Sequence, residues 1–513
     1  MPPPAPPERK RPEAPIPLIL PPGFHRDATT FSAVRAVDGQ HVRWFNGRLR
    51  KIGGYTAGAT QPNGVVRHLD LFWSGTTGYV HSFDDGGISR MTITPAGVLS
   101  AVTARTPAGF TISSNNNWQS AVMYDAASAA NLLLAHCTEN LNDPGDGTSR
   151  PIYTAEVTNT PVLTTTGISV DGGICVLQPY AFGYGSSGSI QWSDANRPTT
   201  WAGGDAGNAR IAASKIVRGF PMFDADYVAG GGSGATGTFW SLDSVMAARY
   251  IGGTVIFRFQ TMNEDEISVL SSNAIAKLDG NFYWPGVDCF YVFANGKTQR
   301  LPNDSNIDWF FENLNFTHRQ KVWCALVRRW GEIWWHFPYD TATECSRALI
   351  FNAHETARTG KHVWYDTTIA RAAGDRPAVF RWPLWANTGD PATLYRHEVG
   401  TNDVDTAGAS TAINSYVETS ALSLQDEKQS DWLLLKRVEH DATQTGDMTL
   451  GVIGREFARA ADTTVNYTVT STQTTTDVME QRRQMRLRWT SNVLGGDFAM
   501  GKPLVHLQPG TGQ

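Results

Sequence analysis

Charged side chains, helical patterning and long apolar runs are all scarce in this chain of 513 residues. Only 18% of the residues are charged, and no stretch combines capping residues with the apolar spacing of a long helix. No apolar run approaches the roughly 20 residues that a membrane-spanning helix requires. We therefore expect neither a long-helix architecture nor a membrane-spanning segment.

Cysteine is also rare, with five residues at wide spacing: Cys137, Cys175, Cys289, Cys324 and Cys345. The count is odd, and no two of them have the CxxC spacing of a zinc or redox site. We expect reduced thiols within strands, formed in a reducing cytoplasm.

The motifs of common catalytic and nucleotide sites are missing from the sequence. There is no GxxxxGK[ST], no GxGxxG after a strand and no GxSxG. His354-Glu355 and His397-Glu398 suggest a metalloprotease motif, but the second histidine is replaced by Arg358 or Thr401. We therefore predict no catalytic residue, no cofactor or cofactor-binding residue and no metal ligand, so the chain is predicted not to be an enzyme.

An excess of positive charge is absent too. The 43 basic and 48 acidic residues give a formal net charge of −5. Proteins that grip nucleic acid tightly are usually basic, because phosphate contacts supply most of that affinity. This balance suits a protein that nucleic acid passes without sticking.

Turn formers and bulky strand formers are what the sequence has in quantity. It contains 49 Gly, 27 Pro and 17 Trp, and 11% of its residues are aromatic. Many turns between aromatic-rich segments are typical of all-β proteins. The length exceeds one ordinary core, so we expect several domains or a large repetitive β-architecture.

The clearest unit lies around Trp330–Pro338. Val322–Arg329 and Ile333–Phe337 form a predicted hairpin whose turn contains Gly331, and Arg347–Asn352 and Lys361–Asp366 supply a third and a fourth strand. Four short antiparallel strands joined by short turns are the unit of a propeller blade.

Similar short strands recur along the chain at spacings near ten residues. Asn46-Gly47, Asp279-Gly280 and Asn295-Gly296 are predicted hairpin turns. Gly253–Phe259 is predicted to pair with Glu266–Leu270. We expect at most one or two helical turns, within Asn306–Gln320.

The predicted architecture is an all-β, propeller-like ring of short antiparallel blades. Residues 1–30 form an extended Pro-rich arm, residues 31–395 the propeller-like body and residues 396–513 a C-terminal β-region. That last region is either the final blades of the ring or a separate β-domain.

Two basic clusters and one turn have both a structural and a functional interpretation. Arg43, Arg48, Arg50 and Lys51 form either a binding patch or the solvated face of a hairpin. Alternation within Arg482–Arg488 predicts one charged strand face, which is solvated or faces a channel or another subunit. Trp192–Trp201 loosely matches the Asp-box turn of sialidase propellers, but without its glycine.

Several segments together resemble the short-tail tube proteins of tailed bacteriophages, the nozzle or tail tubular protein B relatives of podovirus tails. The likeness covers residues 31–400. The segments that carry it are Val42–Gly54, Leu270-Ser-Ser, Tyr283–Phe290, Phe310–Asn315, Lys321–Trp323, Gly331–Pro338, Glu344-Cys345, Trp364–Asp366 and Tyr395–Thr401.

The resemblance implies a structural virion protein, made in the bacterial host cytoplasm and located in the tail. It implies a β-propeller subunit and a homo-oligomer, a hexameric ring, below the head-to-tail adaptor protein. The ring retains genomic DNA and then conducts it through its lumen during ejection, without specific binding. Tail fibres or a tail needle are further implied partners, and the Pro-rich arm is expected to reach a neighbouring ring or the adaptor.

Two other functions are compatible with a large β-protein of this kind. One is a carbohydrate-binding or depolymerising propeller, which needs a pocket with suitably separated carboxylates. The other is a peripheral hub to which fibres attach. A shared fold does not decide between them.

Overall fold

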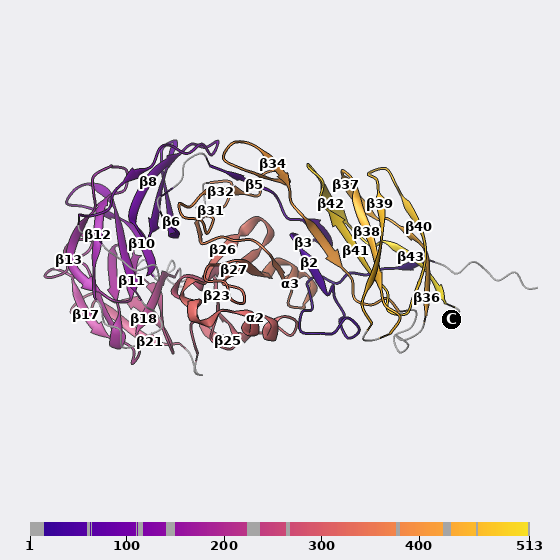
Figure 1. Cartoon of the computed structure of the whole chain (residues 1–513). Helices are drawn as coiled ribbons and strands as arrows, with labels where there is room; N and C mark the ends of the chain where they lie inside the picture. The colour runs from indigo at the N-terminus through magenta and orange to yellow at the C-terminus, as the bar shows by residue number, and fades with distance from the viewer. Residues whose placement is uncertain are drawn as a thin grey trace, which may run out of the picture. The chain divides into compact units, whose positions relative to one another are not determined.

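The computed structural model describes residues 15–58, 62, 64–108, 110, 116–139, 149–222, 236–262, 267–375, 380–423, 432–457 and 460–510. This part of the chain is mostly short strands with few helical turns (Figure 1), which confirms the all-β, propeller-like class. It falls into two compact units. One is Gly53–Ser410, and the other combines Met1–Ile52 with Thr411–Gln513.

Within the described residues, Gly53–Ser410 is a β-propeller of seven consecutive blades. Blade 1 contains β6 (Val66–Ser74), β7 (Thr77–Asp84), β8 (Gly87–Ile93) and β9 (Thr103–Ala104). Blade 2 contains β10 (Asn116–Asp125), β11 (Ala130–Glu139), β12 (Arg150–Glu156) and β13 (Thr164–Val170). Blade 3 contains β14 (Gly173–Leu177), β15 (Tyr180–Tyr184), β16 (Ser189–Trp192) and β17 (Gly207–Arg210). Blade 4 contains β18 (Ile216–Pro221), β19 (Thr236–Ser241), β20 (Val245–Tyr250) and β21 (Phe257–Thr261).

The remaining blades follow in the same way. Blade 5 contains β22 (Ala276–Leu278), β23 (Asn281–Pro285), β24 (Phe290–Ala294) and β25 (Lys297–Leu301). Blade 6 contains β26 (Trp323–Val327), β27 (Glu332–Phe337), β28 (Arg347–Asn352) and β29 (Trp364–Thr367). Blade 7 contains β30 (Ala373–Asp375), β31 (Leu384–Ala386), β32 (Leu394–His397), β5 (Tyr55–Ala57), β33 (Asn402–Val404) and β34 (Ser410–Ala412).

The first strands of the blades form a closed inner ring. β6 contacts β10, β10 contacts β14 and β14 contacts β18, while the short η2 helix (Ser272–Ala274) lies between β18 and β26. β26 contacts β30, and β30 contacts β6. At this last junction the Leu71 N–H donates to Asp375 Oδ2 over 2.9 Å. A sheet series closed in this way leaves no exposed face at either end.

Closure also uses a strand from the start of the unit. β5 pairs antiparallel with β32, where Thr56 lies opposite Arg396, and it pairs parallel with β33. The final blade therefore combines strands more than 300 positions apart in sequence. Pairing between distant segments is what joins the two ends of the propeller unit.

Blade 6 is built as its sequence predicted. β26 pairs with β27, β27 with β28 and β28 with β29, all antiparallel. Gly331 has φ 66°, in the left-handed region that favours glycine, and it follows the η4 turn (Arg328–Trp330). The predicted four-stranded unit is therefore confirmed.

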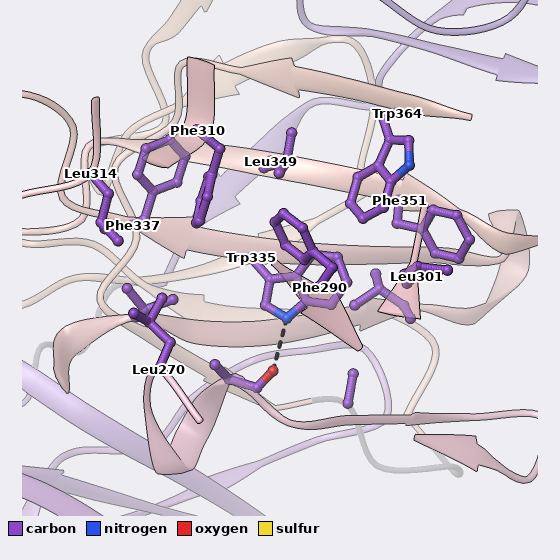
Figure 2. Close-up of a cluster of buried hydrophobic side chains, with 14 of the residues drawn as sticks. Leu270, Phe290, Leu301, Phe310, Leu314, Trp335, Phe337, Leu349, Phe351 and Trp364 are labelled. Carbon is purple, nitrogen blue, oxygen red and sulfur yellow. Dashed lines mark hydrogen bonds between the residues drawn. The ribbon is translucent and has the colours of Figure 1, made fainter. Parts of the chain in front are cut away.

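Both faces of this blade are buried, as expected for a blade between two others. On one face Trp335 joins a core with Phe290 and Trp364 (Figure 2), and Trp335 is fully buried. On the other face Trp323 stacks on His336, with ring centroids 4.5 Å apart, and His336 contacts Trp385 of blade 7. Aromatic pairs of this kind add to the energy of burial.

The short helices lie on connections between strands. α2 (Ile307–Asn313) falls within the predicted helical stretch Asn306–Gln320, and it is followed by η3 (Phe316–Lys321). α3 (Ala353–Thr359) connects β28 to β29, and η1 (Ser186–Gly188) precedes β16. The three predicted Xaa-Gly turns are confirmed, because Asn46, Asp279 and Asn295 all have positive φ, as do the glycines that follow them.

The second unit is made of three sheets. One has the order β1 (Ile16–Pro17), β43 (Leu504–Pro509), β36 (Leu433–Glu439) and β40 (Thr475–Arg482). Another has the order β2 (Asp38–Gln40), β35 (Ser415–Glu418), β41 (Arg486–Ser491), β38 (Met448–Gly454) and β39 (Thr463–Val469). The third has the order β3 (Val42–Phe45), β4 (Arg48–Lys51), β42 (Asp497–Met500) and β37 (Ala442–Thr445).

The boundaries of the two units differ from the predicted boundaries at residues 30 and 395. Residues 31–52 pair with C-terminal strands, since β2 lies beside β35 and β4 beside β42. Residues 396–404 complete blade 7. Residues 15–17 of the predicted arm include β1, which pairs with β43, whereas residues 1–14 lie outside the described residues.

One predicted strand pair is wrong. β21 pairs with β20, and the described part of Glu266–Leu270 forms no strand. Ile267, Val269 and Leu270 are nevertheless buried, and the Leu270 N–H donates to the Pro285 carbonyl oxygen over 3.0 Å. The alternating apolar residues of this segment are buried because a connection between strands packs here, and they do not pair in a sheet.

Candidate functional site

The candidate site is the axial cavity of the propeller. A cavity of about 290 Å³ is lined by residues of β6, β18, β22, β26 and β30, with the η2 segment. A neighbouring cavity of about 550 Å³ is lined by β10, β14 and β18. Propellers enclose a central channel between their inner strands, and small-molecule sites are concave and few per protein.

Hydrogen bonds cross the axis at the level of η2. Asn117 Nδ2 of β10 donates to Ser272 Oγ over 3.4 Å, and Asn273 Nδ2 donates to the Trp118 carbonyl oxygen over 3.4 Å. Blade 2 and the start of blade 5 are thereby joined across the ring. The axial cavity is therefore divided by side chains and is not an open pore.

Arg218 projects from β18 into the axial cavity. Its Nη1 donates to Asn273 Oδ1 over 3.2 Å, and its guanidinium lies 4.8 Å from the Phe220 ring centroid. Among the described residues it has no carboxylate partner. A guanidinium carries five N–H donors in a planar fork, so most of its donors are not used by the protein.

His68, Ser120 and Asp70 form a hydrogen-bonded chain beside the same cavity. Ser120 Oγ donates to Asp70 Oδ2 over 2.7 Å and lies 2.9 Å from His68 Nε2. Because the single hydroxyl proton points to Asp70, the imidazole N–H must donate to the hydroxyl. A hydrolytic serine needs the imidazole to take its proton. The arrangement therefore ties β6 to β10 and does not activate the hydroxyl.

The pKa values of the groups in and around this hydrogen-bonded chain fit a structural role. Burial, reinforced by the charge of Arg218, lowers the pKa of His68 to about 3. Burial raises the pKa of Asp70, and the Ser120 hydrogen bond opposes that rise. Burial also raises the pKa of the Cys324 thiol to about 12, although Arg218 acts in the opposite direction. His68 and Cys324, which feel the charge of Arg218, are thus neutral at pH 7.

The two His-Glu pairs have other partners in the structure. His397 accepts a hydrogen bond from Arg371 Nε over 2.9 Å, and Glu398 accepts one from Trp330 Nε1 over 3.1 Å. His354 is exposed, and Glu355 pairs with Arg358. In the described ranges no three His, Cys, Asp or Glu residues cluster in a way that could hold a metal ion.

The first basic cluster does not form one patch. Arg43 and Lys51 are buried, and Lys51 Nζ donates to the Gly496 carbonyl oxygen over 2.8 Å. Arg48 is exposed and Arg50 is partly exposed. Arg43, Arg48 and Arg50 lie on one face of the β3–β4 hairpin and Lys51 lies on the other. Because Arg43 and Lys51 are buried, the predicted solvated face applies only to Arg48 and Arg50.

The second basic cluster spans two strands rather than one. β40 ends at Arg482 and β41 begins at Arg486. Arg486 is buried and lies 2.8 Å from Glu418 Oε1, while Arg488 Nε donates to Glu418 Oε2 over 2.9 Å. The predicted solvated face is therefore wrong for Arg486, because Glu418 lies opposite it.

The structural interpretation of the turn within Trp192–Trp201 fits its hydrogen bonds to the backbone. Asp194 Oδ1 accepts the Asp205 N–H over 3.0 Å, and Trp192 Nε1 donates to the Asp205 carbonyl oxygen over 2.8 Å. The Asp194 N–H in turn donates to Thr200 O over 2.8 Å. A carboxylate that bonds a backbone N–H holds the connection between β16 and β17.

Sequence reasoning did not find the residues that line the axial cavity. Arg218 is a single charge in a short apolar strand, and His68 and Asp70 flank an apolar residue in β6. The one sequence signal that could have found them is a polar residue that alternates with apolar residues in a strand expected to be buried on both faces. A polar residue there must find a partner or face a cavity.

A wider cavity of about 1010 Å³ lies away from the axis, between β20, β21 and the Asn295-Gly296 turn. Met222, Thr236 and Met262, which line it, adjoin in sequence residues 223–235 and 263–266, which the structure does not describe. We place no site there. No helix in the described ranges is both long and apolar enough to cross a membrane.

No protein-family model and no curated protein matches the chain. Among solved structures, an exo-β-1,3-galactanase from Phanerochaete chrysosporium with galactose aligns over 89% of this chain and 100% of that chain, at 11% identity and a TM-score of 0.26. BBS1N in complex with ARL6DN, soaked with mercury, aligns over 69% and 98%, at 9% identity and a TM-score of 0.40. The lead-soaked form of that complex aligns over 69% and 99%, at 8% identity and a TM-score of 0.39. Similarity at this level carries no argument about function.

Proposed function

We propose that this chain is a structural, non-enzymatic virion protein that forms the distal tail tube, or nozzle, of a short-tailed bacteriophage. The observation that carries the proposal is where the resembling segments lie. Leu270, Phe290, Phe310, Trp335 and Trp364 come from five of those segments, and all belong to one buried core. Most of the resembling segments therefore belong to one three-dimensional unit of blades 5 and 6, whereas Val42–Gly54 and Tyr395–Thr401 lie outside it.

The lumen of such a nozzle lies between copies of the chain. Side chains divide the axial cavity of the propeller, and the Asn117–Ser272 hydrogen bond crosses it. The major groove of duplex DNA alone is about 12 Å wide, so a duplex does not fit through a divided cavity of this size. The proposed ring, a homohexamer, therefore surrounds its own central space.

The proposed neighbours follow from that position in the virion. The head-to-tail adaptor lies above the ring, tail fibres or a needle lie beside or below it, and genomic DNA passes through the lumen without specific binding. A formal net charge of −5 suits that passage, because strong phosphate contacts would slow the polymer.

Location in the particle tests the proposal. Immunogold electron microscopy of particles of the encoding virus is expected to place label at the distal end of the tail. Label at fibre tips, with binding or cleavage of host surface sugars by the purified chain, would instead establish the carbohydrate-binding alternative. Absence of the chain from purified particles would overturn both.

A further inference from the structure

The axial cavity carries an excess of positive charge. Arg218 and Arg328 both line it, and neither has a carboxylate partner among the described residues. Lys277 lines it too, with Nζ donating to the Pro221 carbonyl oxygen over 2.5 Å. Asp375 is the only acidic residue among those that line this cavity. Low-dielectric walls around charges of one sign concentrate the field in such a cavity.

Arg328 and Lys277 lie close enough for the charge of one to affect the pKa of the other. Burial lowers the pKa of Lys277, and the charge of Arg328 lowers it further. Asp375 supplies one negative charge against these cations, and its Oδ2 accepts the Leu71 N–H. The cavity therefore presents cations at both Arg218 and the Lys277–Arg328 end.

Apolar side chains make up much of the remaining wall. Trp323 is buried, and Phe220 and Leu326 are half-buried beside the cavity. The volume of about 290 Å³ lies at the lower end of the range for small-molecule pockets, about 300–1,000 Å³. A planar guanidinium binds a carboxylate through two parallel N–H donors.

We propose that the axial cavity of the propeller binds a small organic carboxylate with an apolar body, through Arg218. The carboxylate accepts hydrogen bonds from the guanidinium, Lys277 and Arg328 supply further positive charge, and the apolar body lies against Phe220, Trp323 and Leu326. This site is independent of the proposed tail function, since it lies within one subunit.

Isothermal titration calorimetry of the full chain tests the site with benzoate as the probe. We expect saturable binding at one site per chain. Acetate has the charge without the apolar body, and benzyl alcohol has the body without the charge, so each is expected to bind at least tenfold more weakly. Benzoate binding that does not saturate, or that benzyl alcohol equals, would overturn the proposal.

Substitutions of single arginines test which residue binds the benzoate carboxylate. Arg218→Gln is expected to weaken benzoate binding at least tenfold, and Arg218→Lys to weaken it less. Arg329→Gln is the matched control, because Arg329 is exposed, contacts the Trp330 ring and does not line the cavity. Should Arg218→Gln fail to fold, Arg328→Gln at an exposed position serves instead, with an expected loss of threefold or more. Unchanged affinity in the folded variants would contradict the assignment.

Discussion

Trp335 donates its indole N–H to the carbonyl oxygen of Ala274 over 2.8 Å, and so joins blade 6 to the segment that begins blade 5 (Figure 2). The ring is fully buried and its centroid lies 5.4 Å from that of Phe290. One side chain thereby fills the space between two blades and satisfies a backbone acceptor there. This makes Trp335 part of the scaffold and not of a binding surface.

Replacing Trp335 with Ala is expected to lower the free energy of unfolding by about 3–5 kcal/mol, through lost burial and a cavity. Trp335→Phe keeps much of the ring but leaves the Ala274 carbonyl without its donor, which costs about 1–3 kcal/mol. Urea unfolding followed by circular dichroism measures both. Phe316→Ala, at a half-exposed position, is the control and should cost clearly less. A Trp335→Ala protein as stable as the control would contradict this role.

Closure of the ring by β5 can be tested with proline. β5 lies between β32 and β33, so the Thr56 N–H faces a neighbouring strand. Thr56→Pro removes that donor and leaves an acceptor unpaired, at a cost of about 1–3 kcal/mol or more. Ser410→Pro at the start of edge strand β34 is the control. Equal melting temperatures for the two variants would show that β5 does not hold the propeller closed.

Glu418 is expected to stabilise the unit built from both ends of the chain. It meets Arg486 and Arg488, and its side chain is only 5% exposed. Removing one partner of a buried ion pair typically costs about 3–5 kcal/mol, because the other charge stays buried. Glu418→Gln should show a loss of that order in urea unfolding. Asp477→Asn, whose pair with Arg437 is exposed, should show no measurable change.

Acid is expected to destabilise the propeller through its buried histidines. Burial is the main cause that lowers the pKa of each: to about 3 for His68, His81 and His336, and to about 4 for His136. Between about pH 6.5 and these values the unfolded chain binds more protons than the folded one. Stability therefore falls as the pH falls through that window, by about 1.4 kcal/mol per pH unit for each histidine. Asp84 opposes this, because burial raises its pKa to about 7.

The effect of one histidine can be isolated. His336→Phe keeps an aromatic ring against Trp323 but cannot be protonated. Its urea unfolding energy, measured from pH 5 to pH 7, should depend on pH more weakly than the wild type by about one proton. Phe316→Leu, at a half-exposed position without a titratable group, should leave the slope near that of the wild type. Equal slopes for His336→Phe and the wild type would show that His336 is not held neutral.

Short-range signals in the sequence predicted much of the fold. The Asn-Gly and Asp-Gly turns and the four strands of blade 6 are set by residues only a few positions apart. Aromatic residues alternate along Glu332–Phe337, and both faces of the strand are buried, as the Trp335 and His336 contacts show. Local backbone preference and strand periodicity are sufficient for such features.

Long-range pairing could not be predicted in the same way. Nothing within Tyr55–Ala57 indicates that it pairs with Leu394–His397, and nothing in Arg48–Lys51 indicates a partner in Asp497–Met500. Arg486 was expected to face solvent, a channel or another subunit, because its partner Glu418 is 68 positions away in the sequence. The axial cavity was missed for the same reason, since each inner strand contributes only one or two of its residues.

The central claim is that copies of this chain form a ring around a lumen that is distinct from the propeller axis. Electron cryomicroscopy of the purified full-length protein tests it most directly, supported by native mass spectrometry of the same sample. We expect closed rings, six copies each, with a central opening between subunits wide enough for duplex DNA. A protein that stays monomeric at every concentration, and that forms no such ring in particles of the encoding virus, would contradict the claim.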